Sequence, residues 1–372
     1  MISKFAALRA SMTTATENTG RLVSSRVLKA VLVIMVVWVV SFSALNNIDT
    51  LTGRRVEKNR GAFDRLAHGG PQTKNHPQTS TQGHVSDTDV PALQTPSRPH
   101  DTLITYVYAE SKFGRENLAY FVQIGLHRAA DFVFIFNGES DAPNLLPDWD
   151  NIRVVRRNNT CYDMGAVGEV LRTNNLWKSY TKFMSINSSL RGPFIPYWSG
   201  GCWTDLYLNK ITDTVKFVGL TVNCHPRPHV QSMIFATDET GMSILLDPDH
   251  ATSGVADKFG GADDPVGLTG CYNNHRAAVH SEVGLTTLIQ NAGYAVDVMM
   301  AAMHQETSLE AYCNATHSDD VLFNDAYFGF NVHPYETIFM KTNRDIDPVA
   351  IKKLSEWHLK RNLTSQTLCP AR

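Results

Sequence analysis

The chain has 372 residues, of which 43% are hydrophobic and 19% charged, a composition that can build a folded core and that excludes a mainly disordered protein. Its 34 Lys and Arg residues against 36 Asp and Glu residues give a formal charge of −2, so the overall charge does not favour nucleic acid as a partner. The 14 His and 6 Cys residues do not show the spacing of a structural zinc site.

An uncharged apolar run occupies residues 30–45 near the N-terminus. As a helix, these residues span roughly 24 Å, and a few flanking residues extend the span to a thin bilayer. We therefore predict a cytosolic tail at 1–28 and a transmembrane signal anchor at 29–46. A cleaved signal peptide is the alternative, although the 29 residues before the run are long for one.

Cysteines and glycosylation sequons all follow this apolar run. An even number of cysteines indicates disulfides in an oxidising compartment, and sequons are glycosylated only in the secretory pathway. The sequence therefore predicts a type II protein of the Golgi or ER membrane with a lumenal, disulfide-bonded body. The pairings stay open, and free core thiols are the alternative for Cys161 and Cys202. The cysteines are Cys161, Cys202, Cys224, Cys271, Cys313 and Cys369, and the sequons begin at Asn158, Asn187, Asn314 and Asn362.

The region after the anchor changes composition twice. Residues 47–100 are rich in Gly, Pro, Ser, Thr, Gln and His and contain too few large apolar residues to offset the entropy of ordering. We predict a disordered stem there. A folded domain is expected at 101–345, and a C-terminal helix or tail at 346–372.

Short apolar runs alternate with helical patterns through the folded domain. Strands are predicted at 103–108, 132–136, 152–155, 180–186, 215–222, 229–236 and 294–299, and helices at 115–126, 166–177, 203–211 and 277–292. This alternation predicts an α/β fold, a Rossmann-type and mainly parallel sheet flanked by helices. Such sheets bind ligands at the carboxyl ends of their strands, so the polar residues at those positions are the candidates for a site.

The segment after the third predicted strand contains Asn158, Asp163 and Gly165. A carboxylate and backbone amides between a strand and a helix N-terminus are suited to holding a nucleotide. The alternative is that Asp163 only caps the helix, with Gly165 in its first turn.

The segment after the fourth strand runs from Asn187 through Ser189 to Arg191 and ends in Gly-Pro. Polar side chains here are expected to face the ligand crevice, but an ordinary polar turn explains them equally well. Further along, Glu282 is interpreted as opening the apolar helix that ends at Gly293. A capping charge in the first helical turn is the alternative there.

The order of these three segments resembles the inverting nucleotide-sugar glycosyltransferases of the GT-A fold. Residues 159–166 and 187–194 (NSSLRGPF) resemble the rhamnan-synthesis F-type family and its fungal-like, single-anchor relatives. The resemblance covers residues 103–344. It implies a hexosyl- or deoxyhexosyltransferase that moves a sugar from a nucleotide diphosphate to a hydroxyl of a glycan or glycoconjugate. It also implies that Glu282 is the general base.

The remaining roles follow from the same resemblance. The donor would be held by Asn158, Asp163, Gly165, Asn187, Ser189 and Arg191. Candidates for the acceptor side are His229, Gln231 and Asp205. Where the family carries the Asp-x-Asp that binds a divalent metal (Mn or Mg), this chain has Asn187-Ser188-Ser189, so no metal ligands are predicted. Arg191 is expected to supply part of the missing positive charge.

The missing Asp-x-Asp keeps a second class of function open. A chain that retained this fold and lost the metal motif is a catalytically inactive sugar-binding or scaffold protein of the secretory pathway, because fold alone does not establish activity.

Overall fold

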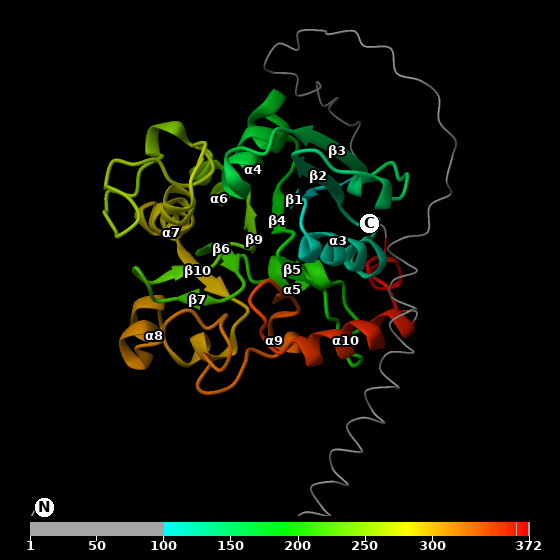
Figure 1. Cartoon of the computed structure of the whole chain (residues 1–372). Coiled ribbons are helices and arrows are strands. Elements are labelled where there is room, and N and C mark those ends of the chain that lie inside the picture. Colours follow the sequence, from blue (N-terminus) through cyan, green and yellow to red (C-terminus); the bar gives the residue numbers. More distant parts are fainter. Residues whose placement is uncertain (1–99, 362, 371–372) are drawn as a thin grey trace, which may run out of the picture. The chain divides into compact units, whose positions relative to one another are not determined.

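The structure is a computed structural model that describes residues 100–361 and 363–370. These residues belong to one compact unit, Ser86–Arg372, shown in Figure 1. The predicted tail (1–28), anchor (29–46) and nearly all of the predicted stem (47–100) lie outside the described residues. Within the described part of the chain, no helix has both the length and the apolar character required to cross a membrane.

A seven-stranded sheet forms the centre of this unit, in the order β10-β6-β9-β4-β1-β2-β3. All neighbouring strands pair in parallel except that β9 is antiparallel to both β4 and β6. The predicted α/β class with a mainly parallel sheet is therefore confirmed. The strands are β1 (Thr102–Ala109), β2 (Asp131–Asn137), β3 (Ile152–Arg157), β4 (Lys182–Asn187), β6 (Val215–Gly219), β9 (Ile234–Asp238) and β10 (Ala295–Val298).

Helices flank this sheet, and the strands are accordingly apolar on both sides. All seven residues of β2 are buried, as expected for a strand covered on both faces. On one face Phe121 of α3 (Lys112–Ile124) packs against Tyr106 and Phe134. Since side chains alternate along a strand, the intervening residues face the layer of α4 (Tyr162–Arg172), α6 (Glu239–Leu245) and α7 (His275–Asn291), in which α7 contacts both α4 and α6 (Figure 1).

Three predicted elements differ from the structure. The strand predicted at 215–222 ends at Gly219 as β6, and Val222 belongs to a separate short strand. The helix predicted at 166–177 begins at Tyr162 and ends at Arg172, because Asn174 and Asn175 adopt positive φ angles of 54° and 53°. The strand predicted at 229–236 is divided. Its first part, β8 (His229–Val230), pairs with β7 (Val222–Asn223) outside the main sheet, and its second part lies within β9.

The C-terminal segment packs on the body as an integral part of it. The two-residue strand β5 (Leu190–Arg191) pairs with β11 (Met340–Lys341), and α10 contacts α3. The remaining helices are α5 (Trp203–Leu208), α8 (Leu309–Thr316), α9 (Pro334–Thr337), α10 (Pro348–Lys360) and α11 (Ser365–Leu368). Four 3-10 helices complete this part of the chain, η1 (Ala142–Leu145), η2 (Thr173–Ser179), η3 (Pro248–His250) and η4 (Ala301–Gln305).

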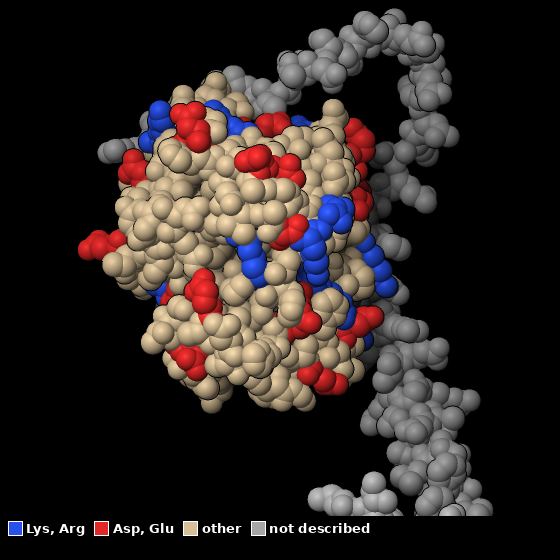
Figure 2. Space-filling view, turned by 90° about the vertical axis from the view of Figure 1, so that its left-hand side faces the viewer, with Lys and Arg blue, Asp and Glu red and all other residues tan. Residues whose placement is uncertain are grey.

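All six cysteines form disulfides, which confirms that prediction and rules out free thiols at Cys161 and Cys202. The bonds are Cys161–Cys271, Cys202–Cys369 and Cys224–Cys313. They close loops of 110, 167 and 89 residues, and in the chain-entropy description a loop of about 100 residues stabilises the fold by roughly 4–5 kcal/mol. On the face of the molecule in Figure 2, acidic and basic side chains are interspersed and form no extended area of one sign.

Candidate functional site

The site lies where the strand order of the sheet reverses. The chain adds β2 and β3 on one side of β1 and then crosses back, so that β4 pairs with the other side of β1. The connections that leave β1 and β4 therefore diverge, and ligands of open α/β sheets bind in the crevice that this divergence leaves at the carboxyl ends.

A cavity of about 600 Å³ occupies this crevice, a volume within the range of small-molecule sites. It is formed by the last residues of β1, β2 and β4, by the segment that enters α4, and by two asparagines from later in the chain. The lining residues are Val107, Ala109, Asn137, Asn159, Thr160, Cys161, Tyr162, Asp163, Asn187, Ser188, Ser189, Asn273 and Asn343. Three residues proposed from the sequence, Asp163, Asn187 and Ser189, are thus brought together.

Asp163 and Asn187 form the centre of this cavity wall. The Asn187 side-chain amide donates to Asp163 Oδ2 at 2.7 Å, and Asn187 Oδ1 accepts from the backbone amide and hydroxyl of Ser189 at 3.2 and 2.6 Å. Burial of the carboxyl raises the pKa of Asp163 above its usual value; the bond from Asn187 opposes this, and the charge of Glu282 adds to it. The Asp163–Asn187 pair is consequently polar and held in place, and the Asp163 carboxyl takes up a proton more readily than a carboxyl group in water.

The other two residues predicted in the first segment have different surroundings. Gly165 lies inside α4, where a Cβ atom would come within 2.7 Å of the Gly270 carbonyl oxygen. Its place is explained by close packing of the 270–271 segment, which the Cys161–Cys271 disulfide holds against α4. Asn158 is exposed and does not line the cavity, whereas its neighbours Asn159 and Thr160 do.

Glu282 lies in the middle of α7, not at its beginning. The helix starts at His275 and is capped by Asn274, so the sequence-based placement of Glu282 at a helix opening is wrong. A role as a first-turn capping charge is therefore also excluded. The helix begins seven residues earlier, and Ser232, in the segment between β8 and β9, donates to Glu282 Oε2 at 2.8 Å.

The surroundings of Glu282 favour its ionised form. Its side chain is 25% exposed, and His229 Nε2 lies 3.8 Å from Oε1. Burial alone would raise the pKa of Glu282, but the contact with His229 and the charge of Lys341 outweigh burial, and the pKa lies below its usual value. Because Asp163 responds to the charge of Glu282, the two carboxyl groups belong to one electrostatic cluster.

His229 and Gln231 lie next to this cluster and are held by hydrogen bonds of their own. Both are buried; His229 Nδ1 lies 2.8 Å from the Arg227 carbonyl oxygen, and Gln231 donates to Asp320 at 3.1 Å while accepting from Thr221 at 2.7 Å. Side chains bonded in this way can position their neighbours, and their contact with an acceptor stays a prediction.

Two further predicted site residues lie elsewhere. Arg191 is buried, and its guanidinium donates to Asn117 at 2.7 Å and to Glu116 at 3.3 Å, both on α3. Asp205 lines a different cavity together with Thr102, the first residue of β1. Because β1 ends at Ala109, Asp205 is near the opposite edge of the sheet, roughly 20 Å from the crevice at about 3.3 Å per residue.

Several residues of the site were not predicted from the sequence. Lys341 influences Glu282, and the pKa of Lys341 in turn responds to Glu282, Asp320 and Asp163. Asn273 accepts from the Cys161 backbone amide at 3.0 Å and lines the cavity with Asn343. None of these residues belongs to a local motif; Asn273, two residues after Cys271, comes nearest to a detectable signal.

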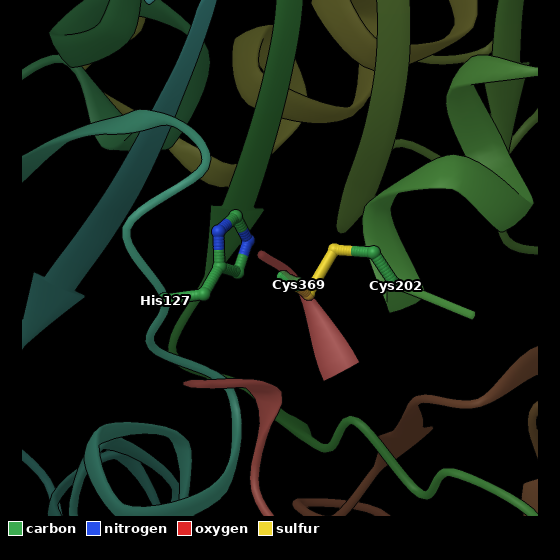
Figure 3. Close-up of side chains that lie close together, drawn as sticks. All are labelled: His127, Cys202 and Cys369. Atoms are coloured by element: carbon green, nitrogen blue, oxygen red, sulfur yellow. A yellow bond between two sulfur atoms is a disulfide. The ribbon is translucent and has the colours of Figure 1, made fainter. Parts of the chain in front are cut away.

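The position expected for a divalent metal does not fit one. Residues 187–189 offer an amide and two hydroxyl groups, and the amide is already bonded to Asp163 and Ser189. Among the described residues, the His, Cys, Asp and Glu side chains that come close enough to hold a metal are His127, Cys202 and Cys369. Figure 3 shows that the two cysteines of this group are bonded to each other, and a disulfide lacks the thiolates that bind metals.

No protein-family model and no curated protein matches the chain significantly, so these searches do not support the rhamnan-synthesis F-type family. Among the solved structures that match is the apo structure of WbbM, a bifunctional glycosyltransferase, at 12% identity and a TM-score of 0.28. The match covers 41% of this chain and 35% of that one, so the chain corresponds to about a third of that structure. Neither a family nor a function follows from a similarity of this size.

Proposed function

We propose that this protein is a glycosyltransferase that moves a sugar from a nucleotide-diphosphate donor to a hydroxyl group of a glycan or glycoconjugate. The observation that supports it is the crevice between β1 and β4, where the Asp163–Asn187 pair lines a cavity and Glu282 and Lys341 lie within its electrostatic reach. A donor-sized cavity with a carboxylate base and a cation beside it has the parts that such a transfer requires.

The donor side would be formed by Asp163, Asn187 and Ser189, whose amide and hydroxyl groups suit ribose and phosphate oxygens. Tyr162 lines the same cavity and is 44% exposed, so its ring offers a surface on which a base can stack. Asn158 is kept in this proposal as a further residue of the donor side. The donor screen described below identifies the nucleotide base and the sugar.

Glu282 is proposed as the general base of an inverting transfer. The acceptor oxygen attacks the anomeric carbon, the bond from that carbon to the diphosphate breaks, and the acceptor proton passes to Glu282. The nucleoside diphosphate leaves with the bonding electrons, and the configuration at the anomeric carbon is inverted. The lowered pKa of Glu282 keeps its carboxylate free to accept that proton at neutral pH.

The experiment is a donor screen with the wild-type protein and the Glu282→Gln variant. Glutamine keeps the size of the side chain and can still accept from Ser232, but it cannot take up a proton. We expect turnover to fall by about 10²- to 10⁴-fold, while donor affinity and the unfolding temperature change little. Turnover is measured as nucleoside diphosphate release, and the anomeric configuration of the product by NMR.

Glu239→Gln is the matched control, because Glu239 is an exposed glutamate on α6 and does not line the cavity. It should transfer at the wild-type rate. Wild-type turnover by Glu282→Gln would contradict the assignment of the base and would point to Asp163, a carboxylate that lines the cavity.

We further propose that the chain is a single-pass type II protein of the Golgi or ER membrane. The apolar run at 30–45 supports an anchor, and the pairing of all six cysteines supports an oxidising lumen. Protease added to sealed microsomes should trim the N-terminus and spare the chain beyond about residue 50. Digestion of the body under the same conditions would contradict this topology.

A non-catalytic sugar-binding protein is the second candidate, and the absence of a carboxylate at residues 187–189 favours it. The donor screen separates the two candidates, because a binding protein would bind a nucleotide sugar and release no nucleoside diphosphate.

A further inference from the structure

The ribbon formed by β5 and β11 determines which basic side chain faces the site. In the antiparallel register, Met340 is opposite Arg191 and Lys341 is opposite Leu190. Residues directly opposite each other share one face of a ribbon, and successive residues alternate between faces. Because Arg191 points to α3, Leu190 and Lys341 point to the other side, and the charges of Glu282 and Asp163 act on Lys341.

The ribbon also joins the cavity wall. The Thr342 backbone amide donates to the Ser189 carbonyl oxygen at 3.1 Å, and Ser189 and Asn343 both line the cavity. Lys341 thus precedes Thr342, whose backbone amide bonds the cavity wall, and lies two residues before Asn343, which lines the cavity.

The Lys341 side chain makes no hydrogen bond or ion pair within the described part of the chain. It is only partly exposed, and burial together with Arg344 lowers its pKa, against the opposing effects of Glu282, Asp320 and Asp163. A lysine in such a position lacks both full hydration and a direct partner, and a bound anion would supply that partner.

Each nearby carboxylate already has a closer partner than Lys341. Asp320 accepts from Arg344 and Gln231, Glu282 accepts from Ser232, and Asp163 accepts from Asn187. The ammonium group acts on these carboxylates through its charge, but its hydrogen-bonding positions are left for a ligand.

We propose that Lys341 is the cation that binds the diphosphate of the nucleotide-sugar donor, in the place where the metal-binding carboxylates are missing. This inference rests on the proposed function, because it concerns the same crevice. A diphosphate requires concentrated positive charge, and neither residues 187–189 nor Arg191 supplies it. A lysine acts as a point charge in phosphate sites.

The test measures binding, so that it does not depend on catalysis. Uridine, guanosine and cytidine diphosphates and monophosphates are titrated into the full chain by calorimetry, in the presence of a metal chelator. We expect Lys341→Met to weaken binding of the preferred diphosphate by about 10- to 100-fold, the effect of one hydrogen bond to a charged group. The preference for diphosphate over monophosphate should shrink, and Lys341→Arg should retain most of the affinity.

Lys352→Met is the control, because Lys352 is exposed on α10 and should bind as the wild type does. If Lys341→Met does not fold, Lys341→Gln replaces it. If the folded variant binds the diphosphate as tightly as the wild type, and the wild type turns over the donor, the role of Lys341 is overturned and the proposed function stands. A loss of affinity without any wild-type turnover supports the anion site and overturns the proposed transfer. No nucleotide binding by the wild type overturns both.

Discussion

The hydrogen bond between Asn187 and Asp163 explains why an asparagine occupies position 187. The resemblance described above led us to expect a metal-binding carboxylate near position 187, but Asn187 stands there and its amide donates to Asp163 at 2.7 Å. Burial already raises the pKa of Asp163, so a second carboxylate at position 187 would add repulsion at short range. The asparagine keeps the polar contact without that repulsion.

Asn187→Asp tests this reading through the pH dependence of stability. Two carboxyl groups at this distance share a proton, so one of the two titrates with a pKa in the folded state above its unfolded value. Such a group contributes stability below its unfolded pKa of about 4, and this contribution is lost as the pH rises through the folded pKa. We expect the variant to lose roughly 1–3 kcal/mol at about pH 8 and little near pH 4.

Thermal unfolding at several pH values measures this difference, and Mn²⁺ should restore part of the loss because it adds a counter-charge. Asn343→Asp is the control, since Asn343 is an exposed residue of the same cavity and should show a nearly flat pH dependence. A loss of stability at position 187 that does not depend on pH would contradict the electrostatic explanation.

At the scale of secondary structure, the sequence predicted the sheet well because each strand is a short apolar run covered on both faces. β1, β2 and β4 were predicted within one or two residues at each end. The residues that follow them could therefore be assigned to the ligand edge, which is why Asp163, Asn187 and Ser189 were found. The helix predicted at 277–292 was likewise close to α7, and the error was to place Glu282 at its opening, since the helix begins at His275.

The position of Arg191 shows what a local pattern cannot predict. Its distance from Asn187 suggested a phosphate ligand, but its direction depends on the pairing of β5 with β11, about 150 residues later. Two-residue strands leave no periodic signal. The same pairing sets the direction of Lys341, the cation proposed above, and a position so far along the chain gave no local signal.

At the scale of the whole molecule, three disulfides link segments that are far apart in the chain. Cys161–Cys271 fixes the entrance of α4 beside the cavity, Cys224–Cys313 joins the segment after β7 to α8, and Cys202–Cys369 ties the C-terminal residues to the start of α5. Their number was predictable from composition. Their connectivity was not, because spacing alone allows 15 pairings of six cysteines.

The central claim is that the crevice between β1 and β4 holds a nucleotide diphosphate. The most direct test is a crystal structure of the protein with the nucleoside diphosphate that it binds most tightly. We predict the nucleotide in the cavity lined by Asp163, Asn187 and Ser189, with the diphosphate between Ser189 and Lys341 and the base towards Tyr162. A nucleotide bound at the opposite edge of the sheet, in the cavity beside Asp205, would contradict the account.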